Sequence, residues 1–298
     1  MRKAARVLIA TLLFFTGAHA VAQETSPQEA WKASIAEGEE AYAGRRLATL
    51  KIDDAIYLKK GERAYLTCAA HCAWRLSPPA VPSPSVAFDG KTGMWSWNGT
   101  TVDLVGLKGG VAYSATIDVI GGIAQVAPGE EGLRVAVYNQ DNPRAKQFTG
   151  FRYYPYNPDF VITAAFEALA VPKAEDFQTS RGWWKRFYLV GHALFSHEGK
   201  RVRLPLYGFS EDPAEVKEVS AFFIDDTTGK ETYQTGRYID MPLALADGPK
   251  TVTLDFNYAY NPACARSAHF NCPVATARLP FSVAAGELIP AEGEGAGH

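Results

Sequence analysis

The residues best suited to chemistry gather in a polar block near the C-terminal end of the chain. Asp255 and Asn257 stand two apart in a stretch that alternates apolar and polar residues, so we expect them to face the same side of a strand. Arg237 could reach them from the preceding segment, because a guanidinium binds a carboxylate with two donor groups. With Glu231 nearby, the group would form a polar site for a small ligand. The alternative is a buried Arg237–Asp255 ion pair that fixes strand register.

The candidate ligand-binding residues share this block. They are Glu231, Arg237, Tyr238, Asp255, Asn257, Tyr260 and Asn261.

The sequence assigns no catalytic residues. It contains no Gly-x-Ser-x-Gly, phosphate-loop or His-Glu-x-x-His motif, which are the commonest signatures of hydrolases and nucleotide-binding enzymes. His192 and His197 are more typical of packed or surface histidines than of a general base. We therefore expect a noncatalytic binding or structural protein, with a hydrolase-like enzyme using Glu231, Arg237 and Asp255 as the alternative. Whether the protein is an enzyme stays open at this point.

The four cysteines form two local couples, Cys68 with Cys72 and Cys264 with Cys272. In an oxidising compartment the simplest interpretation is one disulfide in each couple. Pairing across the couples and free thiols remain open. A further alternative is a zinc site, because each couple also carries a histidine, His71 or His269. Apart from that alternative, we expect no cofactor.

The first 22 residues predict export. Arg2, Lys3 and Arg6 precede an apolar run and two small-x-small sites, which is the pattern of a signal peptide cleaved after Ala22. The run is too short to span a bilayer comfortably, and we expect no transmembrane span in the mature chain. The protein would then be periplasmic or secreted.

The charge of the chain argues against nucleic-acid binding. The whole sequence has 30 basic and 32 acidic side chains, a net charge of −2. Removal of residues 1–22 takes away three basic groups and no acidic ones, so the mature chain has 276 residues and a net charge of −5. A protein without a basic field lacks the electrostatic attraction that nonspecific nucleic-acid binding needs. We expect instead a small polar ligand or a component of the cell envelope as the partner.

Segments of different character position these residues. Ser26, Pro27 and Glu29 supply a cap, a first helical residue and a capping box, so residues 23–44 predict a helix. Short strands follow, with Asn98-Gly99 as the strongest hairpin turn and Gly121-Gly122 as another. 

The expected fold is all-β. Its segments are a signal peptide (1–22), an N-terminal helix (23–44), a β-sandwich domain (45–148), a second sandwich or barrel-like domain (149–290) and a disordered tail (291–298).

Aromatic runs offer a second kind of candidate site. Trp183-Trp184 follows a Ser-Arg-Gly sequence and is the pair we expect to be exposed. Such rings can line an apolar or sugar-binding groove, although core packing explains them equally well.

Several blocks of the second β region occur in one order: Asp-Thr-Thr-Gly at 226–229, Glu-Thr-Tyr at 231–233, Gly-Arg-Tyr at 236–238 and Leu-Asp-Phe-Asn at 254–257. With Tyr-Asn-Pro-Ala-Cys-Ala at 260–265, this order resembles the domain of unknown function 1684 (DUF1684) family, over roughly residues 150–288. The resemblance implies an all-β arrangement whose N-terminal part is similar to a degenerate forkhead-associated sandwich. It implies no activity, because the family has none assigned. Arg266 and the stretch 274–277 depart from the family pattern.

Overall fold

The computed structural model describes residues 25–88, 95–102, 111–114 and 116–290. The predicted signal peptide and C-terminal tail lie outside the described residues. Helix α1 (Pro27–Glu39) begins as predicted: Ser26 caps it, Pro27 is its first residue, and Glu29 completes the capping box. One π-helical turn (Glu40–Gly44) continues it to the end of the predicted helix.

The N-terminal module is the part of the chain that contains strands β1 to β9. Its strands are β1 (Ile52–Leu58), β2 (Arg63–Cys68), β3 (Cys72–Arg75), β4 (Ser85–Phe88), β5 (Trp95–Trp97), β6 (Thr100–Val102), β7 (Val111–Ser114), β8 (Ile117–Ala127) and β9 (Glu130–Asn139). They form one sheet in the order β1-β9-β8-β7 and another in the order β3-β2-β4-β5-β6. Buried side chains of both sheets, such as Val135 and Leu66, belong to one core, so the two sheets form a sandwich. The likeness to a forkhead-associated domain stays a prediction.

Turn chemistry explains one hairpin of this module and corrects another. Asn98 and Gly99 both have positive φ, 49° and 83°, and join β5 to β6 as a type I′ turn requires. The predicted turn at Gly121-Gly122 is wrong, because both glycines lie inside β8 and pair with β9. The turn after β8 falls instead at Gly129, whose φ is 73°.

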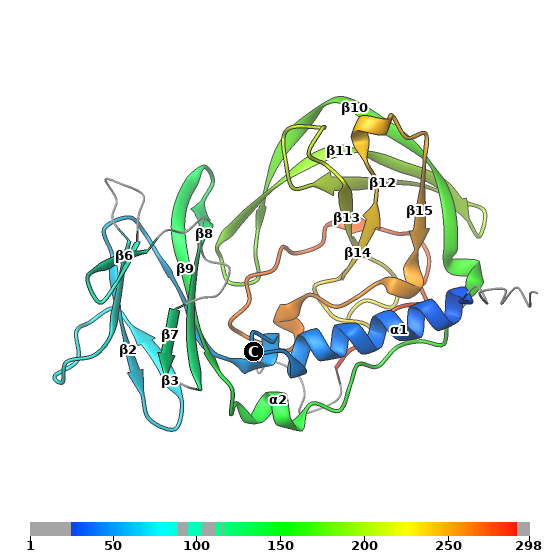
Figure 1. Cartoon of the computed structure of the whole chain (residues 1–298). Helices are drawn as coiled ribbons and strands as arrows, with labels where there is room; N and C mark the ends of the chain where they lie inside the picture. The colour runs from blue at the N-terminus through cyan, green and yellow to red at the C-terminus, as the bar shows by residue number, and fades with distance from the viewer. Residues whose placement is uncertain (1–24, 89–94, 103–110, 115, 291–298) are drawn as a thin grey trace, which may run out of the picture.

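A short helix, α2 (Pro143–Gln147), and a 3₁₀ turn (Pro158–Phe160) lead into the C-terminal module. This module contains β10 (Val161–Gln178), β11 (Trp184–His197), β12 (Lys200–Gly208), β13 (Glu218–Ile224), β14 (Arg237–Pro242), β15 (Thr251–Asp255) and β16 (Ala277–Arg278). Their order is β14-β13-β12-β11-β10-β15, with β16 parallel to β13. The end strands β14 and β15 approach each other, so the sheet is a nearly closed barrel (Figure 1).

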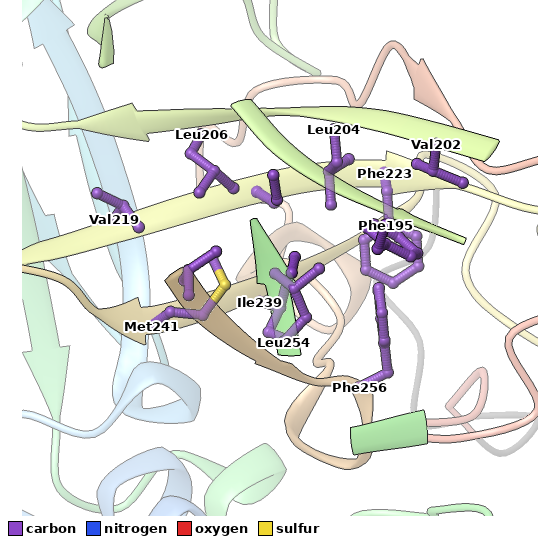
Figure 2. Packing of buried hydrophobic residues seen from close by; sticks show 14 of the residues in the cluster. Phe195, Val202, Leu204, Leu206, Val219, Phe223, Ile239, Met241, Leu254 and Phe256 are labelled. Carbon is purple, nitrogen blue, oxygen red and sulfur yellow. The ribbon is translucent and has the colours of Figure 1, made fainter. Parts of the chain in front are cut away.

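Apolar side chains fill the interior of this barrel. Figure 2 shows Leu204 and Leu206 of β12, Phe223 of β13, Ile239 of β14 and Leu254 of β15 pointing toward one another. Each of these five side chains is at most 1% exposed. The core therefore draws on strands from both edges of the sheet, as closure of a barrel requires.

Helix α1 lies along one end of the barrel (Figure 1). Trp31, its buried residue, donates from Nε1 to the carbonyl oxygen of Asn257 at 2.8 Å. Its ring also packs against Tyr153 and Tyr156, with centroid distances of 5.9 and 5.7 Å. The N-terminal helix is thus part of the C-terminal module in space, although the whole N-terminal module separates the two in sequence.

The predicted all-β class with an N-terminal helix is confirmed. Within the part of the chain that the structure describes, no helix combines the length and the apolar character needed to cross a membrane.

Candidate functional site

Arg237, the centre of the predicted polar site, is buried at the start of β14 and is 1% exposed. Its Nη2 donates to Asp225 Oδ2 at 2.7 Å and to the Val283 carbonyl at 2.8 Å, and its Nη1 donates to the Ala285 carbonyl. Burial lowers the pKa of the guanidinium, and Asp225 opposes that shift.

The predicted pairing of Arg237 with Asp255 is wrong. Phe223 of β13 pairs with Arg237, which places the guanidinium beside Asp225 just after the end of β13. Asp255 lies instead at the end of β15, opposite Val161. Arg237 therefore forms a buried structural ion pair, as the alternative interpretation proposed, but with a different carboxylate.

Asp255 and Asn257 do not form a row of polar groups on one strand. Strand β15 ends at Asp255, whose Oδ1 accepts hydrogen bonds from the backbone N–H of Asn257 (3.0 Å) and from its Nδ2 (2.8 Å). Asn257 is buried in the following 3₁₀ turn and exchanges two hydrogen bonds with the backbone of Asn157 (2.8 and 2.9 Å). Together with Trp31, these bonds tie the helix, the 153–158 turn and the barrel into one unit.

Asn261 belongs to a second buried polar cluster. Its backbone N–H donates to Glu287 at 2.7 Å, and its side-chain amide donates to the Leu288 carbonyl at 2.8 Å. Glu287 also pairs with Arg266, and both side chains are at most 3% exposed. Burial raises the pKa of Glu287, and Arg266 opposes the shift. The rings of Tyr42 and Phe151 lie near the Arg266 guanidinium, at 5.8 and 4.8 Å. The cluster anchors the end of the N-terminal helical segment.

The remaining three candidates also make internal hydrogen bonds. Glu231 is exposed and accepts from the Tyr154 hydroxyl at 2.9 Å. The Tyr238 hydroxyl donates to the Pro273 carbonyl, and the Tyr260 hydroxyl donates to Asp240 at 2.8 Å. The residues predicted as one ligand site are therefore distributed over several structural clusters.

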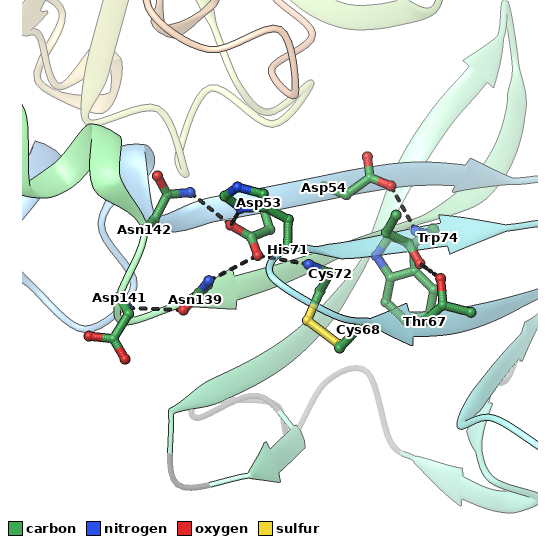
Figure 3. Close-up of a disulfide and its surroundings, with 11 residues drawn as sticks. Asp53, Asp54, Thr67, Cys68, His71, Cys72, Trp74, Asn139, Asp141 and Asn142 are labelled. Atoms are coloured by element: carbon green, nitrogen blue, oxygen red, sulfur yellow. Dashed lines mark hydrogen bonds and ion pairs between the residues drawn. A yellow bond between two sulfur atoms is a disulfide. The ribbon is translucent and has the colours of Figure 1, made fainter.

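The first cysteine couple lies at a hairpin. The sulfur atoms of Cys68 and Cys72 are 2.09 Å apart, at disulfide-bonding distance, where β2 meets β3 (Figure 3). Asp53 of β1 accepts a hydrogen bond from the backbone N–H of Cys72 at 2.9 Å and others from the side chains of Asn139 and Asn142. The predicted local pairing of this couple is thus possible.

The second couple is not joined: Cys264 and Cys272 are buried free thiols. They lie in contact, with the backbone N–H of Cys264 3.4 Å from Cys272 Sγ. The hydrogen bond between the thiols lowers the pKa of Cys264 to about 7 and raises that of Cys272. The predicted second disulfide is therefore corrected to a pair of thiols inside the aromatic cluster of the C-terminal module.

The two cysteine couples do not come together as the zinc alternative requires, because Cys72 packs in the core of the N-terminal module and Cys264 and Cys272 in that of the C-terminal module. His71 Nδ1 lies 3.7 Å from Asp53, while His269 Nδ1 lies 3.4 Å from Asp54, so each histidine has a carboxylate neighbour. Cys68 and Cys72 are close enough to bond each other rather than a metal. The described residues contain no group of three or more His, Cys, Asp or Glu side chains arranged to hold a metal ion.

A cavity lies elsewhere, as a cleft between β8 and β11 that has a volume of about 1190 Å³. Both modules contribute to its walls, and Figure 1 shows β8 and β9 on the side of the N-terminal module that faces the barrel. The residues that line it are Tyr57, Lys60, Ile120, Gly121, Gly122, Ile123, Ala124, Gln125, Gly129, Glu130, Glu131, Arg134, Trp184, Lys185, Arg186, Phe187, Tyr188, Phe209, Phe270 and Asn271. We call this space the intermodule cleft. None of the seven predicted site residues lines it.

Contacts between the modules hold the walls of the intermodule cleft in place. The ring of Tyr57 stacks on Trp183, with centroids 5.0 Å apart and planes inclined by 20°. The Arg134 guanidinium lies over the Phe270 ring at 5.3 Å and donates to the His269 carbonyl at 3.1 Å. Burial raises the pKa of the Tyr57 hydroxyl, and Arg134 opposes that shift.

Cationic and amide groups provide the polar chemistry of the cleft. The cleft walls desolvate the Lys185 ammonium, which lowers its pKa, and the nearby Arg134 acts in the same direction, while Cys272 and Cys264 act against both. Two of the lining residues, Gln125 and Asn271, carry an amide oxygen without a hydrogen-bond partner among the described residues, but both oxygens are buried and offer no accessible surface to a ligand. The cationic groups of the wall can attract an anion.

Sequence reasoning found one edge of this cleft and missed the rest. The Trp183-Trp184 pair, predicted to be exposed, supplies Trp184 to the wall and Trp183 to the stacking contact with Tyr57. No local pattern marked Lys185, Arg134 or Gln125, because their nearness depends on how the two modules pack. The sequence signal that pointed to the cleft was the Trp183-Trp184 pair, because these rings do not belong to a regularly spaced series of apolar residues.

Comparison with known proteins supports the family resemblance. Residues 146–288 match the model of a family described as "Protein of unknown function (DUF1684)". Among solved structures, the chain is similar to an uncharacterized protein of Haloarcula marismortui determined by solution NMR. The two are 31% identical over 49% of this chain and 80% of that chain, with a TM-score of 0.40. No curated protein matches the chain. The match of residues 146–288 to the family model shows that the chain, through its C-terminal module, belongs to the DUF1684 family.

Proposed function

We propose that the mature protein is a noncatalytic, exported binding protein that holds a small polar ligand in the intermodule cleft. The observation that carries this proposal is the cleft itself, because it combines aromatic rings and cationic side chains in one cavity. Binding sites typically have this composition, with mainly apolar walls and a few polar groups that fix orientation.

The position of the cleft between two modules also supports a binding role. Ligand sites often lie at domain interfaces, since each side supplies part of the complementary surface. Here β8 supplies Gln125 and β11 supplies Lys185, and a hydrogen bond of 3.0 Å from Gln125 Nε2 to Asp176 joins β8 to β10 of the other module. A ligand in the cleft would contact both modules at once and would stabilise their arrangement.

A noncatalytic role agrees with the positions of Glu231, Arg237 and Asp255, the residues that the enzyme alternative would use. Arg237 is buried against Asp225, and Asp255 holds the turn that follows β15. Neither the pair nor Glu231 lines the intermodule cleft. The residues of the enzyme alternative thus hold the fold together rather than converge on a cavity.

Export is part of the proposal and rests on the N-terminal pattern. The proximity of Cys68 to Cys72 supports it, because disulfides persist in oxidising compartments. Intact-mass measurement of the protein from its native host should give a chain that begins at Gln23. A full-length, cytosolic product with reduced Cys68 would contradict export.

The binding proposal is tested by blocking the cleft. A Cβ added at Gly122 meets no heavy atom within 4 Å, and Gly122 lines the cleft. Gly122→Trp should therefore fill the cleft without disturbing β8. Native mass spectrometry of the mature protein with pooled neutral sugars, acidic sugars, amino acids and dipeptides should show ligands that wild type retains and Gly122→Trp loses.

Thr253→Trp supplies the matched control, because Thr253 is exposed on β15 in the other module. This variant should bind as wild type does. If wild type retains no compound of the pool, or if Gly122→Trp retains the same compounds while correctly folded, the cleft is not a ligand site.

A further inference from the structure

We infer that the ligand of the intermodule cleft is an acidic peptide segment in extended conformation, which pairs through its backbone with the open edge of β8. The inference rests on the proposed binding function and adds the chemical class of the ligand. Three features carry it: the pairing of the strands along the cleft, the residues of β8 and the charge of the walls.

Most of β8 has a partner strand on one side only. Its first residues, 117–119, lie between β7 and β9. In the described part of the chain, β9 is the only partner strand of residues 120–127, so the other edge of this stretch is open. In an antiparallel pair, alternate residues direct their N–H and C=O groups away from the partner. The edge therefore offers a row of backbone donors and acceptors to an added strand.

The open edge of β8 faces the intermodule cleft. Successive side chains of a strand point to opposite faces, so a cavity against one face is lined mainly by alternate residues. Here six consecutive residues of β8, 120–125, line the cleft, and the neighbours Gly122 and Ile123 are both exposed. Across the cleft, residues 184–187 of β11 also line the cavity and pair with β10 only, because β12 ends at Gly208, opposite Tyr188. The cleft thus runs along strand edges.

The residues of β8 suit the close approach of another backbone. Residues 120–127 include no charged side chain and no proline, which are two of the devices that protect an exposed strand edge from pairing. Gly121 and Gly122 lie inside the strand, where glycine often marks the approach of a second backbone. A Cβ added at Gly122 meets no heavy atom within 4 Å, so the space beside it is open. Strand addition accounts for a glycine pair that no turn requires.

The open edge has the length of a short peptide segment. A strand rises about 3.4 Å per residue, so residues 120–124 offer about 17 Å. Beyond them, Gln125 Nε2 donates to Asp176 at 3.0 Å and joins the edge to β10 of the other module. A second copy of the chain is a poorer occupant, because its own β8 edge lies in a cleft with an opposite wall, whereas a peptide is one strand wide.

The charge of the cleft walls favours acidic side chains on the peptide. The lining residues include four cations but only two carboxylates, which stand at the first two positions of β9. Arg186 pairs with Asp176, and Arg134 donates to a backbone carbonyl. In the described part of the chain, no carboxylate lies within ion-pair distance of the other two cations, Lys60 and Lys185. Both ammonium groups are thus available to Asp or Glu side chains of a peptide.

The first test selects ligands from a phage-displayed library of linear heptapeptides with the mature protein. Gly122→Trp, in which the cleft is filled, serves for counter-selection. Peptides enriched in Asp or Glu should emerge, and the strongest of them is synthesised and titrated by calorimetry. Its amide analogue, with Asn and Gln in place of Asp and Glu, should bind about tenfold more weakly.

Backbone methylation of the synthetic peptide tests the strand pairing. N-methylation removes one amide donor and leaves the side chains unchanged. Methyl groups on alternate residues, whose N–H groups face β8, should reduce the affinity at least tenfold, whereas methyl groups on the intervening residues should have a much smaller effect. Hydrogen exchange followed by NMR should show that the peptide protects alternate amides of residues 120–124.

Variants assign the binding to the edge of β8 and to the charge of the walls. Ile123→Lys, at a position in the cleft that is 49% exposed, adds an edge-protecting charge and should reduce the affinity at least tenfold. Val171→Lys, at a position of β10 outside the cleft that is 73% exposed, is the matched control and should bind as wild type does. Lys185→Met should weaken binding of the acidic peptide about tenfold and leave its amide analogue unchanged, whereas the exposed Lys217→Met outside the cleft should change neither.

The inference is overturned if the library yields no peptide that distinguishes wild type from Gly122→Trp, if N-methylation has the same effect at every position, or if Ile123→Lys or Lys185→Met binds the acidic peptide like wild type. Equal protection of the edge amides without peptide also overturns it. In a dimer such protection assigns the edge to a second copy, and in a monomer it shows that the chain covers its own edge. Sedimentation velocity distinguishes these two cases.

The proposed binding function fails separately from this inference. If Gly122→Trp removes binding of a compound that is not a peptide, the cleft is a ligand site and only the ligand class is wrong. If correctly folded Gly122→Trp retains every ligand of wild type, the cleft is not a ligand site and both proposals fail.

Discussion

Two polar regions of the molecule contrast in whether they border a cavity. In the motif-rich block around Arg237, Asn257 and Asn261, buried polar side chains are engaged mainly with carboxylates and backbone groups of the same module, and none of the three lines the intermodule cleft. Unpartnered buried atoms occur in both regions, for example Asn261 Oδ1 in the block and Gln125 Oε1 beside the cleft. The comparison teaches that a dense sequence motif can mark a scaffold, whereas an open cavity lined by cations and exposed apolar side chains marks a place for a ligand.

The strongest test of the scaffold role is removal of the buried guanidinium. Arg237→Met should leave Asp225 uncompensated in the interior and lower the free energy of unfolding by about 3–5 kcal/mol. Urea denaturation followed by tryptophan fluorescence measures the loss. The double variant Arg237→Met with Asp225→Asn should recover part of it, because the buried charge is then absent. A loss below about 1 kcal/mol for the single variant would contradict a structural role.

The reciprocal hydrogen bonds of Asn257 should contribute less. Asn257→Ala removes two bonds to Asn157 and one to Asp255 and should destabilise the protein by about 2 kcal/mol. Thr253→Ala on the exposed side of β15 is the matched control and should change stability by less than about 0.5 kcal/mol. Equal effects of Asn257→Ala and Thr253→Ala on the free energy of unfolding would show that the Asn257 side chain does not stabilise the fold.

A substitution in the intermodule cleft should affect ligand binding more than stability, which is the opposite of the expectation for the motif-rich block. Lys185→Met should change the free energy of unfolding by less than about 0.5 kcal/mol, because Lys185 has no ion-pair partner in the described chain. The same variant should lose about a factor of ten in affinity for an anionic ligand of the cleft, which is about 1.4 kcal/mol of binding free energy, because Lys185 lines the cavity. Substantial destabilisation by Lys185→Met would show that Lys185 stabilises the fold. The proposed difference between the intermodule cleft and the motif-rich block would then not hold for this residue.

The contact between the modules should give a small effect on the free energy of unfolding, and one that depends on pH. Burial acts to raise the pKa of Asp54, but hydrogen bonds from His269 and from the backbone N–H groups of Trp74 and Ala55 outweigh it, so the pKa lies below its usual value. A lowered carboxyl pKa contributes stability that is present above the unfolded-state value, about 3.9, and is lost as the pH falls through the folded-state value.

Asp54→Asn should therefore cost less than about 1 kcal/mol at pH 7 and make unfolding less sensitive to acid below about pH 4. Urea titrations between pH 7 and pH 3 compare the two proteins. Parallel stability curves for wild type and variant would show that the Asp54–His269 contact does not contribute.

Local features of the fold could be predicted because nearby residues determine them. The capping box of α1 needs only Ser26, Pro27 and Glu29, and the turn at Asn98-Gly99 needs two residues that accept positive φ. Pairing partners were harder to predict. Arg237 pairs with Asp225 rather than Asp255 because the register of β13 with β14 decides which carboxylate is adjacent.

The cleft could not be predicted for a related reason. Gln125 and Asn271 lie on one cavity because β8 packs near β11 and because the 263–272 loop meets the N-terminal module. Hydrophobic periodicity indicates which side of a strand is buried but not which module covers it. Gly122 illustrates the limit: the sequence favoured a turn, whereas the structure uses the glycine as an open point on the cleft wall.

The contrast between the two regions is tested most directly by one set of calorimetric titrations at a temperature where all variants are folded. Wild type, Asn257→Ala and Gly122→Trp are each titrated with the compound of the ligand pool that wild type binds best. The account predicts that Asn257→Ala, although less stable, binds like wild type, and that Gly122→Trp, although stable, does not bind. Loss of binding in Asn257→Ala with binding retained in Gly122→Trp would contradict it and would return the ligand site to the motif-rich block.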